Sequence, residues 1–263
     1  SWATDLLTYS VFIKFGFFGL TLLGALTVTL AFYFFSKAAG LNFWQKAFIF
    51  PLLLNFEEPL TQVSFRGHLL TLLFLGVLYS LFTLYEKGRK YWLLAAVLLF
   101  VIWSNFHGEF ILGLTVFLLW IFFYLVKKLL VTANVYRHSD PDFIGGRIPL
   151  IHGILRPPVG RLRMTLSSIK FPLFVFFLSF FASMINPFSL DVYLETIKHF
   201  GNPLQRFIIE WLPFENFSFL WWKLVFWGIL LLINIIIMYK KKIILNNIPF
   251  LAISLILYLL SFW

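Results

Sequence analysis

The residues best placed to do chemistry in this sequence are His107 and Glu109, which are separated only by Gly108. They form the corner between two apolar runs, 91–106 and 110–126. Any small polar residues would allow the chain to turn there, so an imidazole and a carboxylate at this corner indicate a function. Such a pair can transfer protons, orient a substrate or contribute to a metal site.

Other polar residues also stand beside the ends of apolar runs. They include the stretch from Asn55 to His68, then Asn105, Asn186-Pro187 and Glu210-Trp211. Ionisable groups at membrane depth are costly and usually face a cavity or a partner. We therefore predict one shared site in which Arg66, His107 and Glu109 converge. Glu57 or Glu58, together with Glu210, is expected at its rim.

The elements that must position these residues are apolar helices. Of the 263 residues, 61% are hydrophobic and only 12% are charged, whereas a soluble domain has about 25% charged residues. This composition excludes a soluble enzyme, a disordered chain and a cytosolic nucleic-acid-binding protein. The absence of cysteine excludes disulfides and thiolate metal sites. The predicted fold class is all-α, a polytopic helical membrane protein.

The apolar runs predict about eight transmembrane segments within one membrane domain, residues 1–263. A helix needs about 20 mostly apolar residues to cross the hydrocarbon core. One predicted segment is short and contains Pro51, and it is counted because the charge pattern requires it. The expected segments are 15–35, 47–56, 67–85, 91–106, 110–126, 171–185, 217–239 and 243–263.

Lys and Arg collect in cytoplasmic loops of membrane proteins, and here their distribution predicts the orientation. The predicted cytoplasmic loops hold 16 of the 21 basic residues: 37–46, 86–90, 127–170 and 240–242. The largest is the basic loop 127–170. Residues 1–10 and 186–216 are then outside, and 8 of the 11 acidic residues share that side.

The outer loop 186–216 contains a short amphipathic pattern. Leu190, Leu194 and Ile197 recur at helical spacing, and Gly201-Asn202-Pro203 ends the pattern. Ser189 is a plausible N-cap. We predict a helix over about residues 190–200 that lies in the membrane interface.

The segment Trp103 to Gly113, W-S-N-F-H-G-E-F-I-L-G, resembles a signature of bacterial and archaeal multi-pass proteins. That signature, W-x-N-x-H-G-x-F-x-x-G, occurs in relatives of the GT-C glycosyltransferases, which include protein O-mannosyltransferase-like and lipid A sugar-transferase-like enzymes. Two positions depart from the family pattern, because Glu109 and Ser189 stand where Gly is common. Weaker similarities bring the covered region to roughly residues 1–215: Trp2 to Tyr9, Ser64-Phe65-Arg66, Asn186-Pro187-Phe188 and Ile209 to Pro213.

The resemblance implies a transferase that takes a sugar from a polyprenyl-phosphate-linked donor to an acceptor on the outer face of a prokaryotic plasma membrane. His107 and Glu109 would be catalytic, and Arg66 would hold the donor phosphate through its guanidinium fork. Other substrate-binding candidates are Asn105, Glu57, Glu58, Glu210 and Arg206. The family's usual catalytic carboxylate lies in the first outer loop, after the first span. We expect both to precede Ser1, so the chain is read as a piece of a longer protein.

The implied partners are membrane lipid and the lipid-linked sugar, with no nucleic acid. Mg²⁺ or Mn²⁺ would suit a carboxylate-rich oxygen site, but the sequence alone designates no metal ligand. The alternative is a non-catalytic transporter, flippase or accessory subunit that handles lipid-linked sugars. Transporters usually place polar groups near the bilayer midplane. The polar groups here stand at segment ends, which favours the enzyme.

Overall fold

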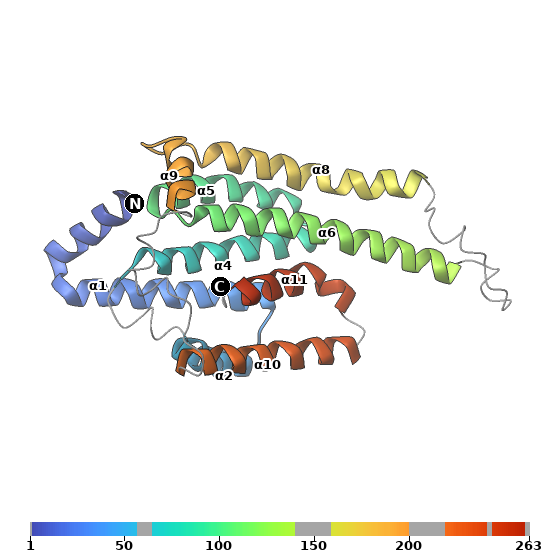
Figure 1. Ribbon diagram of the computed structural model, residues 1–263, viewed down its shortest axis with the longest axis horizontal. Coiled ribbons are helices and arrows are strands. Elements are labelled where there is room, and N and C mark those ends of the chain that lie inside the picture. Colours follow the sequence, from blue (N-terminus) through green and yellow to red (C-terminus); the bar gives the residue numbers. More distant parts are fainter. Residues whose placement is uncertain (1, 57–64, 140–158, 200–218, 241–243, 261–263) are drawn as a thin grey trace. The chain divides into compact units, whose positions relative to one another are not determined.

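The computed structural model describes residues 2–56, 65–139, 159–199, 219–240 and 244–260 (Figure 1). Every regular element in these ranges is a helix, which confirms the all-α prediction. The elements are α1 (Trp2–Ala39), α2 (Phe43–Phe56), α4 (Gly67–Glu86), η1 (Lys90–Leu94), α5 (Ala95–Phe106), α6 (Phe110–Ser139), α8 (Val159–Ala182), α9 (Asp191–His199), α10 (Phe219–Lys240) and α11 (Ile244–Leu260).

Three helical stretches in the described residues are long and apolar enough to cross a membrane. They are Trp2–Ala39, Gly67–Glu86 and Phe110–Val131. On the first of them, Phe17 is 73% exposed and Phe18 is 77% exposed. Large apolar patches of this kind mark interaction with lipid or a partner, and with the span lengths they indicate a membrane protein. The remaining apolar helices are shorter: Lys90–Phe106, Ser168–Ala182, Leu224–Lys240 and Asn247–Ile256.

The chain divides into two compact units. The first comprises Ser1–Phe117 and Val175–Phe207, and it contains the corner at His107. The second comprises Leu118–Phe174 and Ile208–Trp263, and within it α10 contacts α11. Helices α6 and α8 each contribute residues to both units.

Helices α1 and α4 approach closely because small residues lie between them. A Cβ added to Gly76 of α4 would come within 3.0 Å of the Ala31 carbonyl oxygen of α1. The Ser80 hydroxyl donates a hydrogen bond of 3.0 Å to the Phe34 carbonyl oxygen. Close backbone approach at small residues is the usual way that membrane helices pack without a hydrophobic driving force between them.

Helices α4, α5 and α6 are joined by aromatic side chains. Trp103 is fully buried, and its ring centroid lies 5.5 Å from that of Phe74 and 5.6 Å from that of Phe100. The Trp103 ring also fills the space beside Gly113, where an added Cβ would lie only 3.0 Å from Cε3 and closer still to other ring atoms. The first and last residues of the W-to-G segment therefore pack on each other, which fixes the α5–α6 hairpin.

Helix α1 bends at Gly16, whose φ of 61° and ψ of −153° are not helical (Figure 1). The bend lets one helix serve two contacts within the first unit. Beyond it, α1 packs along α4, and before it the N-terminal arm reaches the end of α5. There the Thr4 hydroxyl donates a hydrogen bond to the Phe106 carbonyl oxygen, and Trp2 Nε1 donates to Asn105 Oδ1 at 3.1 Å.

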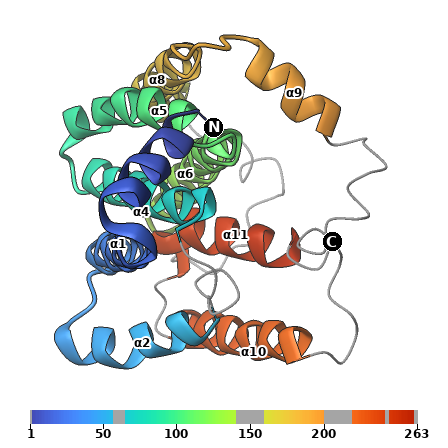
Figure 2. The same ribbon diagram turned by 90° about the vertical axis from the view of Figure 1, so that its left-hand side faces the viewer.

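Helix α9 runs across the direction of α4 and α5 (Figures 1 and 2). Tyr193 attaches it to the first unit through ring contacts with Phe110 and Phe180 and a hydrogen bond with the Ser183 hydroxyl. Leu190 and Leu194 stay more than half exposed. The predicted short helix is thus present as α9, and its position in the membrane interface stays a prediction.

Two boundaries differ from the sequence expectation. Helix α6 continues to Ser139 and α8 begins at Val159, so both ends of the basic segment 127–170 are helical. The α6 extension contains no Pro or Gly, and the first Pro beyond it is Pro141. In α6 the apolar run ends at residue 126, but the helix continues to Ser139. The helix can continue because Lys and Arg, the charged residues in this extension, are good helix formers.

Candidate functional site

A three-residue turn joins α5 to α6 and carries the candidate chemistry. Helix α5 ends at Phe106, and its C-cap residue His107 has extended backbone angles, φ −153° and ψ 140°. The His107 N–H still donates a hydrogen bond of 2.8 Å to the Trp103 carbonyl oxygen. Helix α6 restarts at Phe110, so both His107 and Glu109 belong to the turn.

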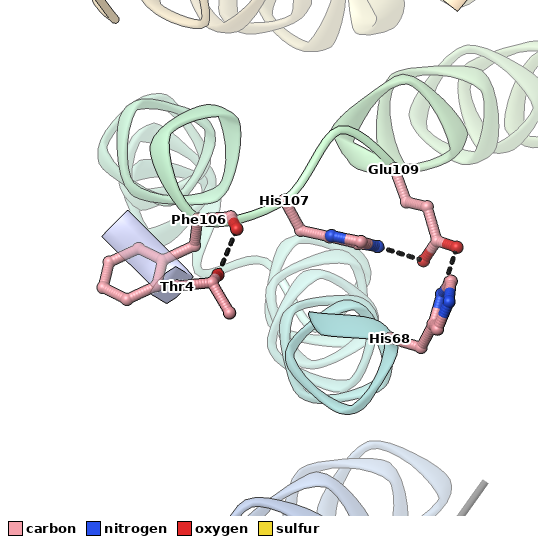
Figure 3. A network of polar contacts seen from close by, with 5 residues as sticks. All are labelled: Thr4, His68, Phe106, His107 and Glu109. Atoms are coloured by element: carbon pink, nitrogen blue, oxygen red, sulfur yellow. Dashed lines mark hydrogen bonds and ion pairs between the residues drawn. The ribbon is translucent and has the colours of Figure 1, made fainter. Parts of the chain in front are cut away.

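The Glu109 carboxylate lies between two imidazoles (Figure 3). Its Oε1 is 2.5 Å from His68 Nδ1, and its Oε2 is 3.4 Å from His107 Nε2. The two imidazole rings meet edge to face, with centroids 5.0 Å apart. His68 comes from the first turn of α4, 41 residues before Glu109. We call these three residues the His–Glu–His cluster.

The cluster is partly open. The side chains of His68 and Glu109 are 37% and 36% exposed, and that of His107 is 18% exposed. Burial by itself raises the pKa of Glu109, but the contacts with His107 and His68 outweigh it and hold the pKa well below its usual range. The carboxylate is therefore ionised at neutral pH, as is expected when donors surround the charged form.

Gly67 allows His107 to reach the carboxylate. A Cβ at position 67 would lie 2.6 Å from His107 Nδ1 and 2.9 Å from Cε1, so any side chain there would displace the ring. Arg66, the N-cap of α4, has extended backbone angles. The His107 ring lies against Gly67, and Arg66 directly precedes Gly67 in the sequence. Arg66 therefore stands at the same end of α4 as His68.

Two buried polar atoms near the carboxylate lack hydrogen bonds to any described residue. One is His107 Nε2, whose 3.4 Å contact with Glu109 falls outside hydrogen-bond geometry. The other is Oγ1 of Thr71, three residues after His68 on α4. Buried polar atoms are nearly always paired, so each exception calls for a physical reason.

The structure brings His107 and Glu109 together and adds His68, whereas the convergence of Arg66 on the same site stays a prediction. The sequence analysis noted His68 beside Arg66 but did not include it among the site residues. The available signal was its place in the first turn of an apolar helix. Four predicted site residues lie outside the described ranges: Glu57, Glu58, Arg206 and Glu210.

Asn105 has several partners within the protein. Its side-chain amide donates hydrogen bonds of 2.8 Å to the carbonyl oxygens of Val101 and Ile185, and its Oδ1 accepts one from Trp2. Asn105 thus links α5, the N-terminal arm of α1 and the chain after α8. These contacts hold the segments around the corner in place.

The chain after α8 turns at Asn186. Its side chain donates to the Ser183 carbonyl oxygen and accepts from the Phe188 N–H, both at 2.8 Å. Ser189 has a φ of 47°, in the left-handed region that Gly adopts without strain. Ser189 is therefore a turn residue two positions before the start of α9, and its predicted role as the N-cap is wrong.

No family model, curated protein or solved structure matches this chain. The fold and the site define an all-helical membrane protein with a His–Glu–His cluster at the ends of its helices. The function is therefore argued from this cluster and from the sequence pattern around it.

Proposed function

We propose that the chain is the membrane domain of a glycosyltransferase-like protein that moves a sugar from a polyprenyl-phosphate-linked donor to an acceptor. The observation that carries the proposal is the meeting of His68, His107 and Glu109 at one helix end. Two of these residues belong to the segment that resembles the GT-C signature. Partly exposed ionisable groups beside apolar helices are a hallmark of functional sites.

The proposed topology has eight spans, with residues 1–10 and the corner at His107 on the outer face of a prokaryotic plasma membrane. The concentration of 16 of 21 basic residues in alternate loops supports it. His68 stands in the first turn of the candidate span Gly67–Glu86, and Glu109 directly precedes the span Phe110–Val131. Both positions support a cluster near a membrane surface, where a lipid-linked phosphate and a water-borne acceptor can meet.

In the proposed reaction an acceptor hydroxyl attacks the anomeric carbon while the bond from that carbon to the phosphate oxygen breaks. Ionised Glu109 accepts a hydrogen bond from the hydroxyl and orients it. A carboxylate with a lowered pKa is a weak base, so Glu109 orients the hydroxyl and the proton passes to the departing phosphate, whose second pKa is about 6. Arg66 binds the departing phosphate through two parallel hydrogen bonds.

The test uses the complete natural protein in lipid nanodiscs, supplied with radiolabelled polyprenyl-phosphate hexoses and pentoses. The readout is release of polyprenyl phosphate. Glu109→Gln is expected to lower turnover by about 100-fold or more, the usual range for a group that assists proton transfer. Glu109→Gly, the commoner family residue, distinguishes a backbone role from a chemical one, because it removes the carboxylate but suits the turn.

Arg66→Lys keeps the charge and loses the bidentate fork, so it is expected to raise the KM for the donor. The matched control is Arg89→Lys, since Arg89 is exposed and precedes η1 at the other end of α4. If labelled donor binds or crosses the bilayer while its sugar–phosphate bond stays intact, the transferase proposal is wrong. The transporter, flippase or accessory-subunit interpretation would then take its place.

A further inference from the structure

We propose that His68, His107 and Glu109 bind one divalent transition-metal ion, with Zn²⁺ as the best-suited metal. The site is defined by side chains that come from two places in the chain, the start of α4 and the α5–α6 turn. Metal binding does not depend on sugar transfer, and each can be measured without the other.

The geometry of the cluster is close to that of a metal site. One ligand atom from each residue lies within 4.8 Å of the other two. Around a tetrahedral zinc ion with bonds of about 2.0 to 2.1 Å, ligand atoms are separated by about 3.3 Å. The 3.4 Å between His107 Nε2 and Glu109 Oε2 already matches that spacing.

The contact between His68 and Glu109 must lengthen when the ion enters. The 2.5 Å between Nδ1 and Oε1 is a hydrogen-bond distance, so these atoms separate by about 0.8 Å to reach the tetrahedral spacing. The His68 side chain has room to move, since it is 37% exposed. The proton held between the two atoms leaves as the metal binds, as is general for histidine and carboxylate ligands.

The donor set selects the class of metal. Two imidazole nitrogens and the Glu109 carboxylate suit Zn²⁺ and its transition-metal neighbours, whereas Mg²⁺ and Ca²⁺ prefer sites made only of oxygen. Three protein ligands leave a fourth position of a tetrahedral ion for an exogenous group. The partial exposure of His68 and Glu109 gives solvent access to that position.

The polar atoms His107 Nε2 and Thr71 Oγ1, which are unpaired among the described residues, are explained better by a metal site than by a His–Glu–His contact with a structural role alone. His107 Nε2 is buried and has no hydrogen bond within the described part of the chain. Leaving such an atom unpaired is unfavourable, and a metal ion between Nε2 and the carboxylate would remove that cost. Thr71 is 5% exposed, interacts with Glu109 and has a hydroxyl without a regular hydrogen bond, so it can support the carboxylate from outside the ligand set.

The experiment measures metal binding to the purified full chain in detergent after treatment with a chelator. Zn²⁺ is titrated against a chromophoric competitor, and Co²⁺ is added separately to record its visible absorption. We expect one Zn²⁺ per chain and a Co²⁺ band typical of four-coordinate geometry. His68→Asn, His107→Asn and Glu109→Gln are each expected to weaken Zn²⁺ binding by more than about tenfold, because removing a ligand exceeds the 10- to 100-fold effect of its supporting residues.

His138→Asn is the matched control, because His138 belongs to α6 and is not part of the cluster. It should leave the Zn²⁺ affinity unchanged. Gel filtration and circular dichroism establish that each variant is folded. Glu109→Asp tests whether a shorter carboxylate restores the Zn²⁺ binding that Glu109→Gln loses. The proposal is overturned if folded wild-type protein gives no Co²⁺ band, or if the His68→Asn/His107→Asn double variant binds Zn²⁺ as tightly as wild type. The wild-type Co²⁺ spectrum decides the question even if every cluster variant fails to fold.

Discussion

Glu109 is charged in the folded protein because imidazole groups approach both of its oxygens. Its lowered pKa also links folding to pH. A carboxyl group whose folded pKa lies below its unfolded pKa stabilises the fold fully above the unfolded value, about 4.3. That contribution is lost as the pH falls through the lower folded pKa.

The first prediction follows from this sign. The Tm difference between wild type and Glu109→Gln in detergent should shrink as the pH falls below about 4.3. Thermal unfolding followed by circular dichroism from pH 7 to pH 3 measures it. Glu86→Gln, at the opposite end of α4, is the control. A Tm difference that grows as the pH falls below about 4.3 would contradict the conclusion that Glu109 is ionised in the folded protein.

The second prediction concerns the two glycines nearest the cluster. Gly67→Ala places a Cβ 2.6 Å from His107 Nδ1 and should destabilise the protein by about 1 to 3 kcal/mol through overpacking. Gly108→Ala meets nothing within 4 Å and should change stability by less than about 0.5 kcal/mol. Chemical unfolding of both variants in detergent gives the comparison. Equal effects would mean that His107 does not pack on Gly67.

Individual residues of the site were only partly predictable. His107 and Glu109 are neighbours in sequence, so their joint role could be inferred from one short turn. The contact of His68 with Glu109 spans 41 residues and depends on how α4 packs beside the α5–α6 hairpin. Packing of that kind leaves no periodic signal in a single sequence, because any apolar face can meet another.

At the scale of elements, the bend in α1 is a property of Gly16. Its φ of 61° and ψ of −153° lie in a region that only Gly occupies readily. The bend is what allows the arm at Thr4 to reach Phe106 while the rest of α1 packs on α4. No sequence signal distinguished it, since Gly16 stands inside a run of helix-compatible residues with several other glycines.

The third prediction tests this bend. Gly16→Ala should destabilise the protein by about 1 to 3 kcal/mol through backbone strain, although nothing lies within 4 Å of the new methyl group. In a straight helix the same change would instead stabilise by up to about 1 kcal/mol. The sign of the change in unfolding free energy therefore decides between the two conformations. Ser10→Ala, at an exposed position of the same helix, is the control and should have little effect.

At the scale of the whole molecule, composition predicted the all-helical class because so apolar a chain must satisfy its backbone hydrogen bonds internally. The number of spans was harder to predict. Helix α2 has 14 residues and contains Pro51, fewer than the roughly 20 that a straight span requires. We predicted that α2 is a span because the distribution of Lys and Arg required one more crossing. Among the described residues, three helices are long enough to span a membrane.

The fourth prediction is the sidedness of the molecule. The natural chain contains no cysteine, so single cysteines can be introduced at positions 108 and 150. In intact cells a membrane-impermeant thiol reagent should label Gly108→Cys and leave Leu150→Cys unlabelled, because basic residues collect on the cytoplasmic side. Permeabilised cells control for reactivity. Labelling at position 150 in intact cells would reverse the proposed orientation.

The contact between α4 and the α5–α6 turn also has a consequence for biogenesis. The ribosome releases His68 first, and Glu109 follows only after α4, η1 and α5 have been made. Until the two side chains meet, the carboxylate stands at the edge of an apolar hairpin with only His107 beside it, which is unfavourable near lipid. Lateral assembly of α4 with the hairpin removes that penalty. We therefore expect the nascent helices to leave the insertion machinery as a group, held together by the pairing of His68 with Glu109.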